Sequence, residues 1–356
     1  MLQNKLKGKH IIYIGRELNS IDGGSIVSKR NVEILKKMSD EKIIEFYLSD
    51  KTIAHKFLNI IFGNPWGYSR EVYNKIKKAL LLNEISYIFI DHSLLGGFSS
   101  ILKKFNVEIV VFFHNIEVKY YKDKASVDGF INKLMVNYAR RNEKKIVKYA
   151  DKIICLTNID SNLLKSIYGR NADLIIPITI EDKFKSLDNL ENNSSYHLFV
   201  GSSFFANIDA IKWYIKNVLP FISSKLIIIG TGMEVLIEQY GQNLNLEIHG
   251  FVDDLTPYYQ GADFVINPVR LGSGMKTKTI EALMYGKIIL GTQEAFSGIE
   301  DIEKHEAGYI CNQPEEFIKK IENLDSKKFN LKSRDYYLSN FSAEFGYNKL
   351  EDFLAS

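Results

Sequence analysis

The sequence has few cysteines and no long apolar run. Its two cysteines, Cys155 and Cys311, lie far apart in or beside apolar stretches, which fits neither a disulfide framework nor a zinc site and favours a reducing compartment. No apolar run approaches the ~20 residues that span a bilayer, and the apolar part of the N-terminus is too short for a signal peptide. We therefore expect a cytoplasmic protein.

The charge of the chain is unevenly distributed. The net charge is +3, but residues 1–185 hold 31 Lys and Arg against 20 Asp and Glu, a balance of +11. Residues 186–356 hold 15 against 23, a balance of −8. This split, in a chain of 356 residues, predicts two domains that face different partners. The basic half carries no nucleic-acid-binding motif, and we expect no nucleic-acid partner.

Short apolar runs alternate with helix-period segments along almost the whole chain. Continuous apolar strands with helices between them are typical of a parallel sheet covered on both faces. A polar stretch rich in Asn and Ser, at 179–197, is interpreted as a linker. We therefore predict an α/β fold of two doubly wound Rossmann-like domains, 1–185 and 186–341, with a C-terminal helix at about 342–356 that packs back on the first domain. The predicted strands are 10–15, 42–48, 85–91, 107–113, 152–157, 173–177, 196–201, 225–230, 246–250, 263–268, 287–292 and 307–310.

The stretch LGSGMKTKTIEALMYGK, at 271–287, predicts an anion site. It follows a predicted strand, and open α/β sheets bind ligands at the carboxyl ends of their strands. Glycines let the backbone approach a ligand, and the free N–H groups of a helix starting near Met275 attract an anion. Glu281 is better placed to accept hydrogen bonds from ribose hydroxyls. The cations and glycines expected at this site are Arg270, Gly272, Gly274 and Lys276.

The sequence of this loop also allows other interpretations. A helix entered through a Gly-containing loop, with solvated lysines, explains the loop alone equally well. The phosphate loop of nucleotide triphosphatases does not fit, because Met275 stands where its glycine is needed. The dinucleotide-binding pattern also fails, since Val235 replaces its third glycine in GTGMEV.

The same residues resemble the donor-binding signature of glycosyltransferase family 4, whose members have the GT-B fold. NPVRLGSGMKTKTIEALMYGKIILGT, at 267–292, carries this resemblance, and 199–220, 227–234 and 249–268 follow in the family's order. Weaker similarities in the first half lie at 21–25, 112–121 and 150–169. The resemblance implies a retaining, metal-independent enzyme without a cofactor, which moves a sugar from a nucleoside-diphosphate sugar to an acceptor. The donor would lie on the second domain and the acceptor on the first, with a cleft between them.

Carried over residue by residue, the resemblance implies that Glu281 binds the ribose hydroxyls of the donor. It also implies that the diphosphate is bound by Gly272, Ser273, Gly274, Met275 and Lys276. Lys276 and Arg270 would act on the leaving group. Two departures from the family pattern leave the contacts of the donor sugar open. Ser273 stands where the family often has a second glutamate. The segment GSSFFANID, at 201–209, lacks a common pair of basic residues, for which Arg270 and Lys276 would substitute; Lys278 is not assigned to the site.

The resemblance also assigns residues in the first half. His114, after a buried strand, would lie near the donor sugar and bond a hydroxyl or assist proton transfer, whereas a structural histidine is the alternative. Gly23 and Gly24 would lie across the cleft from the phosphates, or form a turn before a helix capped by Ser25. Further acceptor-side candidates are Asp91 and His92. Asp253 and Asp254 suggest a metal pair, but a surface turn is favoured there, and we expect no metal.

Three functions remain open from the sequence. The favoured one is a glycosyltransferase of surface polysaccharide or glycoconjugate assembly, with a lipid-linked or glycan acceptor. A catalytically inactive GT-B partner subunit is the alternative, and a GT-B-like sugar-nucleotide epimerase is disfavoured. Basic residues at 118–150, and aromatic and basic residues at 55–80, predict peripheral attachment to an anionic membrane on its inner face, against the alternative of an ordinary solvated surface.

Overall fold

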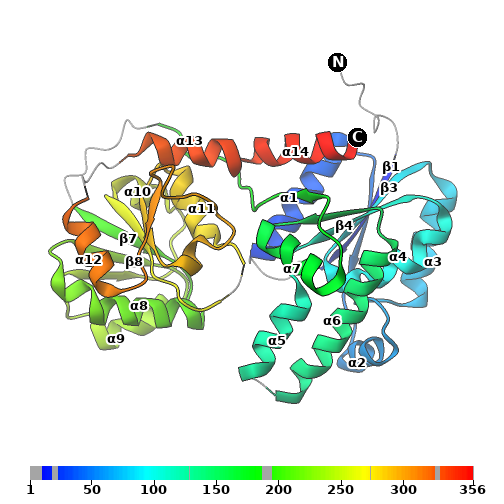
Figure 1. Cartoon of the computed structure of the whole chain (residues 1–356), viewed down its shortest axis with the longest axis horizontal. Coiled ribbons are helices and arrows are strands. Elements are labelled where there is room, and N and C mark those ends of the chain that lie inside the picture. Colours follow the sequence, from blue (N-terminus) through cyan, green and yellow to red (C-terminus); the bar gives the residue numbers. More distant parts are fainter. Residues whose placement is uncertain are drawn as a thin grey trace. The chain divides into compact units, whose positions relative to one another are not determined.

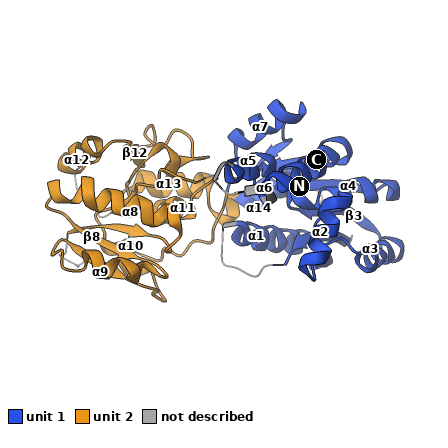
Figure 2. Cartoon of the chain, turned by 90° about the horizontal axis from the view of Figure 1, so that it is seen from below, with its two compact units in different colours: residues 1–177, 346–356 blue, residues 178–345 orange. Residues whose placement is uncertain are grey.

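The fold is taken from a computed structural model that describes residues 10–17, 23–127, 129–186, 195–272, 274–324 and 329–355. The chain divides into two compact units (Figure 2). Unit 1 comprises residues 1–177 and 346–356, and unit 2 comprises residues 178–345. The division thus falls at Pro177, before the boundary at 185 predicted from the polar linker, because Ile180 already pairs with Ser342 of unit 2.

Unit 1 is built around a six-stranded parallel sheet of order β2-β1-β3-β4-β5-β6. The middle strands are completely buried apolar runs, and helices lie on both faces of the sheet (Figure 1). This is the arrangement that continuous apolar strands require. The strands are β1 (His10–Arg16), β2 (Ile43–Leu48), β3 (Ile85–Asp91), β4 (Glu108–Phe113), β5 (Lys152–Cys155) and β6 (Leu174–Ile175). The helices are α1 (Gly23–Met38), α2 (Ile53–Phe62), α3 (Arg70–Leu82), α4 (Gly97–Leu102), α5 (Glu117–Val127), α6 (Gly129–Tyr149) and α7 (Asn158–Tyr168).

Unit 2 repeats this architecture with a second parallel sheet of order β12-β11-β10-β7-β8-β9. The strands are β7 (Tyr196–Val200), β8 (Lys225–Ile229), β9 (Leu246–His249), β10 (Phe264–Asn267), β11 (Ile289–Gly291) and β12 (Gly308–Ile310). The helices are α8 (Phe205–Asn217), α9 (Ile237–Tyr240), α10 (Thr256–Gly261), α11 (Thr277–Met284), α12 (Pro314–Glu322) and α13 (Leu331–Asn340). Each predicted strand corresponds to an observed one, which confirms the predicted fold class of two doubly wound Rossmann-like domains.

The last helix, α14 (Ala343–Ala355), starts in unit 2 and ends in unit 1. Within unit 1 the Tyr87 hydroxyl donates to the Leu354 carbonyl at 2.5 Å, and Lys152 Nζ donates to the Phe353 carbonyl at 3.2 Å. The Lys37 ammonium lies 4.1 Å from the centroid of the Tyr347 ring. The final turns of the chain are therefore held by side chains of unit 1.

Local sequence explains where several helices begin and end. Thr52 and Ser69 cap α2 and α3, because their hydroxyls accept the backbone N–H groups of His55 and Val72. Gly63 ends α2 in the left-handed conformation, with φ of 65°. Helix α11 differs, since its N-cap residue is Lys276, whose side chain accepts no backbone N–H. The first turn of α11 therefore lacks a side-chain cap.

Candidate functional site

The loops that follow β7 and β8 pack against each other at the carboxyl edge of the sheet of unit 2. Gly230 has φ of 159°, and a Cβ there would stand 1.9 Å from the Gly201 carbonyl oxygen. Gly232 has φ of 79°, and a Cβ there would stand 2.3 Å from the Ser203 hydroxyl. These two positions therefore need glycine, and they keep backbone rather than side chains at this edge.

The loop between β10 and α11 reaches the same edge with two more glycines. Gly272 and Gly274 have φ of 125° and 75°, a conformation that other residues rarely adopt. Met275 is buried beneath the loop, and Ser273 lies outside the described residues. Because α11 starts just after Lys276 without a side-chain cap, its first N–H groups can bind an anion.

Both cations predicted for the leaving group already have acidic partners. Lys276 Nζ lies 2.5 Å from Glu294 Oε1, in a partly buried ion pair. Arg270 pairs with Asp209 at 3.0 Å and lies 4.9 Å from the centroid of the Trp213 ring on α8. The structure thus keeps Lys276 beside the glycine loop, whereas Arg270 contacts the outer part of α8.

The cation that faces the first loop of unit 2 is Lys278, which the sequence analysis left unassigned. Its Nζ donates to Asn207 Oδ1 at 2.7 Å and lies 4.2 Å from the centroid of the Phe199 ring. A Cβ on Gly201 would lie 2.9 Å from this Nζ. Desolvation, followed by repulsion from Lys276, lowers the pKa of Lys278 to about 7. Segment 201–209 contains no basic residue, and Lys278 places a cation beside it.

Glu281 lies one turn into α11, on the side of the helix that also carries Lys278. Its Oε2 accepts a hydrogen bond from the Tyr259 hydroxyl at 3.3 Å, and the Tyr259 and Tyr285 rings are stacked. Desolvation raises the pKa of Glu281. The spacing of three residues between Lys278 and Glu281 is the sequence signal that could have assigned this lysine, because such residues are neighbours on a helix.

In unit 1, the carboxyl edge of the sheet holds a buried group of polar side chains centred on Asp91. This carboxylate accepts hydrogen bonds from Tyr13 at 2.5 Å and Asn31 at 3.0 Å, and His114 Nε2 lies 2.8 Å from it. Burial alone would raise the pKa of Asp91, but His114 and the hydrogen bonds outweigh it and lower that pKa to about 2. Asp91 is therefore a charged group that orients His114, whose Nδ1 is buried and has no partner among the described residues.

His92 adjoins this group in an unusual backbone conformation. Its φ is 148°, which is costly for a residue with a side chain and is typical of functional sites. The ring stacks on His114 with centroids 5.4 Å apart. Its Nδ1 lies 3.2 Å from the Leu94 backbone nitrogen, and its Nε2 lies 3.3 Å from Arg16 Nη1 and 3.5 Å from Glu117 Oε1. Burial, and then the neighbouring Arg16, lower the pKa of His92 well below its usual value.

Two buried carboxyl groups lie behind the histidines, and sequence analysis assigned neither. Burial and then repulsion from Glu143 raise the pKa of Glu117 to about 8, while burial raises that of Glu143 to about 7. Glu143 accepts the Glu117 N–H at 2.6 Å and the Tyr168 hydroxyl at 2.5 Å. The pair therefore holds a proton near neutral pH. Glu117 stands three residues after His114, and this was its only signal in the sequence.

The remaining candidates show less. Helix α1 begins at Gly23, so Gly24 is in its first turn and Ser25 is not its cap; residues 18–22 are outside the described ranges. Asp254 accepts the Thr256 N–H at 2.8 Å in an exposed turn, as favoured from the sequence.

In the part of the chain that the structure describes, no group of three or more His, Cys, Asp and Glu is placed to hold a metal. None of the described helices is long and apolar enough to cross a membrane.

Comparison with known sequences relates the second half of the chain to sugar transfer. Residues 194–326 match the family model described as glycosyl transferases group 1. A protein of Klebsiella pneumoniae, named as an uncharacterized 44.6 kDa protein in the cps region, is 26% identical over 204 residues. The match covers 52% of this chain and 51% of that protein, so the chain spans about half the length of the curated relative.

Solved structures resemble nearly the whole chain. HepE from Anabaena, in complex with UDP and glucose, has a TM-score of 0.67 and 13% identity, over 98% of this chain and 100% of that one. A trehalose-6-phosphate synthase, studied for glycosyl transfer with retention, has a TM-score of 0.61 and 12% identity, over 97% and 98%. The fold is therefore GT-B, and together with the family model it supports a glycosyltransferase.

Proposed function

We propose that the protein is a retaining, metal-independent glycosyltransferase of family 4. It would transfer a sugar from a nucleoside-diphosphate donor to an acceptor in surface polysaccharide or glycoconjugate assembly. The observation that carries this proposal is the edge of unit 2, where the uncapped start of α11, two loops of glycines and the cation of Lys278 come together. HepE, with the same fold, is seen with UDP and glucose, and the Klebsiella relative comes from a cps region.

In this proposal each group at the edge of unit 2 has a separate task. The helix N–H groups and Lys278 bind the diphosphate, and they stabilise the negative charge that grows on it as the sugar leaves. Lys276, with its charge shared with Glu294, holds the glycine loop in place and contributes a smaller electrostatic effect. Glu281 accepts the ribose hydroxyls, for which its partly desolvated carboxylate is suited.

In unit 1, the histidines at the edge of the sheet would act on the acceptor. Asp91 holds His114 in one orientation, and the unpartnered Nδ1 of His114 is free to bond a hydroxyl of the transferred sugar. Glu117 and Glu143 keep a proton close to His92. Glu143, whose pKa is about 7, is partly ionised near neutral pH, so the group can receive the proton that the acceptor hydroxyl loses during transfer.

Release of nucleoside diphosphate from a panel of nucleotide sugars, with and without candidate acceptors, tests the reaction. Acceptor-dependent release with retained anomeric configuration supports a retaining transferase. Binding without turnover of any donor would favour the alternative of an inactive GT-B partner subunit. Conversion of the donor sugar without any acceptor would identify an epimerase.

We also propose that unit 1 attaches to the anionic inner face of the cell membrane through α2. Five apolar side chains of this helix are at least half exposed: Ile53, Phe57, Leu58, Ile61 and Phe62. Basic side chains of α6 lie beside it, since Arg141 and Lys145 donate to the carbonyls of Ile61 and Gly63. An exposed apolar face beside basic residues suits the headgroup region of an anionic bilayer.

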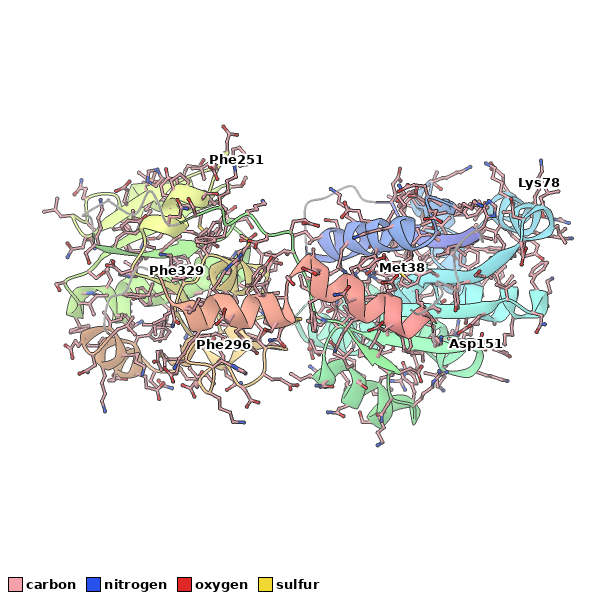
Figure 3. All side chains as sticks on the ribbon, turned by 90° about the horizontal axis from the view of Figure 1, so that it is seen from above. Met38, Lys78, Asp151, Phe251, Phe296 and Phe329 are labelled. Carbon is pink, nitrogen blue, oxygen red and sulfur yellow. The ribbon has the colours of Figure 1, made fainter. Side chains whose placement is uncertain are left out.

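Vesicle sedimentation with Phe62→Ser tests this attachment. Phe62 is 72% exposed, and Phe251 of unit 2, which is 71% exposed and projects from its unit in Figure 3, provides a matched control. We expect Phe62→Ser to weaken binding to anionic vesicles, Phe251→Ser to leave it unchanged, and salt to weaken it in both. Equal binding to neutral and anionic vesicles, or none to either, would leave a soluble acceptor as the better proposal.

A further inference from the structure

Unit 1 contains a cavity of about 300 Å³ beside the carboxyl ends of β1 and β2. Its walls come from four separate parts of unit 1: the end of β1, the loop after β2, the start of α2 and the turn before α3. The volume is at the lower end of the range of small-molecule sites, which suits a ligand of about one sugar unit. The polar side chains and the indole that line it include Arg16, Ser49, Asp50, Thr52, Lys56 and Trp66.

Two cations lie on the indole of Trp66. The Arg16 guanidinium is 4.9 Å and the Lys56 ammonium 4.7 Å from the centroid of this ring. The ring attracts each cation, but the cations repel each other. A bound anion that contacts both would relieve this repulsion. Both cations line the cavity, where an anionic group of a ligand can contact them.

Asp50, which lines the same cavity, has an acceptor atom without a donor. Asp50 Oδ1 is bonded by Asn59 at 3.0 Å and lies 3.2 Å from His55 Nδ1. Asp50 Oδ2 is buried and has no hydrogen-bond partner in the described part of the chain. The Asp50 side chain is only 6% exposed, so an unmet acceptor there is costly unless a ligand supplies the donor. A second carboxylate at the cavity, Glu17, is exposed to solvent.

The cavity adjoins the histidine group at the edge of the sheet. Arg16, which lines the cavity, lies with its Nη1 3.3 Å from His92 Nε2. Ile53, at the cavity wall, is also the first residue of α2 and is 89% exposed. A ligand in the cavity would therefore lie between the proton-holding groups on one side and the exposed apolar face of α2 on the other.

We propose that this cavity is an acceptor site for a sugar phosphate. The phosphate lies between Arg16 and Lys56, and a sugar hydroxyl donates to Asp50 Oδ2. The inference rests on the proposed function and specifies the chemical class of its acceptor. The phosphate belongs either to a soluble sugar phosphate or to a lipid-linked one whose chain follows α2, and the test below separates these sources.

Tryptophan fluorescence reports on the cavity directly. The chain has two tryptophans, Trp66 and Trp213, and Trp213 belongs to unit 2. In a Trp213→Phe variant of the full chain, the emission therefore comes from Trp66 alone. We expect a saturable change on titration with glucose 1-phosphate and none with glucose, because the phosphate displaces or reorients the cations on the ring.

Variants of single lysines then locate the phosphate. In the Trp213→Phe background, Lys56→Gln should raise the Kd for glucose 1-phosphate about tenfold, the loss expected for one hydrogen bond to a charged group. Lys78→Gln is the matched control, since Lys78 is exposed on α3 at the periphery of unit 1 (Figure 3). No saturable change with glucose 1-phosphate, or the same Kd in wild type and Lys56→Gln, would overturn the proposal.

Two further measurements complete the test. Decyl glucosyl phosphate should bind more tightly than glucose 1-phosphate if the acceptor is lipid-linked, whereas equal Kd values identify a soluble sugar phosphate as the source. Nucleoside diphosphate release from UDP-glucose without acceptor is measured in parallel, and the control Lys78→Gln should leave it unchanged. Phosphate binding without any donor turnover would support the acceptor site and contradict the proposed glycosyltransferase reaction. Donor turnover without phosphate binding would support the reaction and contradict the acceptor site.

Discussion

The two units have the same parallel-sheet architecture, yet the carboxyl edges of their sheets are chemically different. In unit 2 the edge consists largely of backbone and cations: Gly230 packs on Gly201, Lys278 lies beside Gly201, and Lys276 donates to the Gly274 carbonyl. In unit 1 it consists of buried titratable side chains around Asp91. Backbone N–H groups and fixed cations bind an anion, whereas buried acids and histidines hold and move protons. The same fold therefore provides a binding edge in one unit and a proton-transfer edge in the other.

The strongest test of this difference is the loss of one charge from unit 2. Lys278→Met removes the ammonium and keeps an apolar chain of similar length. We expect kcat for nucleoside diphosphate release to fall roughly 10²–10³-fold, because a fixed charge aimed at the leaving group is lost. Stability should not fall, since desolvation makes the charged form of Lys278 unfavourable, as its pKa of about 7 indicates.

Lys276→Met is the matched control for that variant, measured in the same assay with denaturant unfolding as the check on stability. Because Lys276 is already paired with Glu294, the loss of the Lys276 charge should reduce kcat less than the loss of the Lys278 charge. A larger effect from Lys276→Met would assign the leaving-group charge to Lys276, as the family resemblance does.

In unit 1 the corresponding substitution should act on stability. Asp91→Asn removes a buried carboxylate that Tyr13, Asn31 and His114 all contact, and breaking such a buried pair typically costs roughly 3–5 kcal/mol. The pKa of Asp91 is depressed to about 2 from an ordinary 3.8. At pH values above 3.8 the ionised group therefore contributes about 2 kcal/mol to the free energy of unfolding. That contribution is lost as the pH falls through the folded pKa.

Denaturant unfolding of wild type and Asp91→Asn across the acid range measures both effects. The variant should be less stable near neutral pH and should lack part of the decline between about pH 4 and about pH 2. The same unfolding curve at every pH for the two proteins would show that Asp91 is not the charged centre of the group.

A smaller effect is expected in the pH dependence of nucleotide binding. With its pKa at about 7, Lys278 is neutral in much of the free protein above that pH, and a bound diphosphate favours the charged form. Binding then takes up a proton, so the Kd for UDP should rise by up to tenfold per pH unit from about pH 7 upward. UDP itself changes little in this range, because the last phosphate ionisation lies near pH 6.

Calorimetric titration of UDP in buffers of different ionisation enthalpy measures this proton uptake. Lys278→Met should abolish both the uptake and the slope. Glu281, whose pKa is raised by burial, is the other titrating group on this side of α11, so Glu281→Gln serves as the control and should retain the slope. A slope that disappears in Glu281→Gln instead would assign the proton to the carboxyl group.

Sequence analysis was more informative for unit 2 than for unit 1, for a physical reason. The residues of the predicted anion loop are contiguous, so glycine spacing and the start of α11 could be inferred from local pattern. Even there it did not identify Lys278, because its closeness to Gly201 and Asn207 depends on how α11 packs against the loop after β7. The predicted strands were all found, since buried parallel strands have a strong apolar signal.

The group in unit 1 could not be assembled in this way. Arg16, His92, Glu117 and Glu143 come from β1, the end of β3, α5 and α6, and only the folded sheet brings them together. His114 was selected because it follows a predicted strand, and Asp91 because it lies at the end of one. Glu143 lies in the middle of a long basic helix, and nothing in its sequence neighbourhood indicates a buried carboxyl group with a raised pKa.

The smallest effect should come from removal of metal. In the proposed reaction, Lys278 and the N–H groups of α11 meet the charge that a divalent ion neutralises in metal-dependent transferases. In unit 1, both oxygens of Asp91 already accept hydrogen bonds or contact His114. We therefore expect the initial rate of nucleoside diphosphate release to change less than about twofold in excess EDTA. Complete loss on chelation, restored by Mg²⁺ or Mn²⁺, would mean that the edge of unit 2 does not stabilise the leaving group unaided, and the contrast between the two edges would then need a metal ion in unit 2.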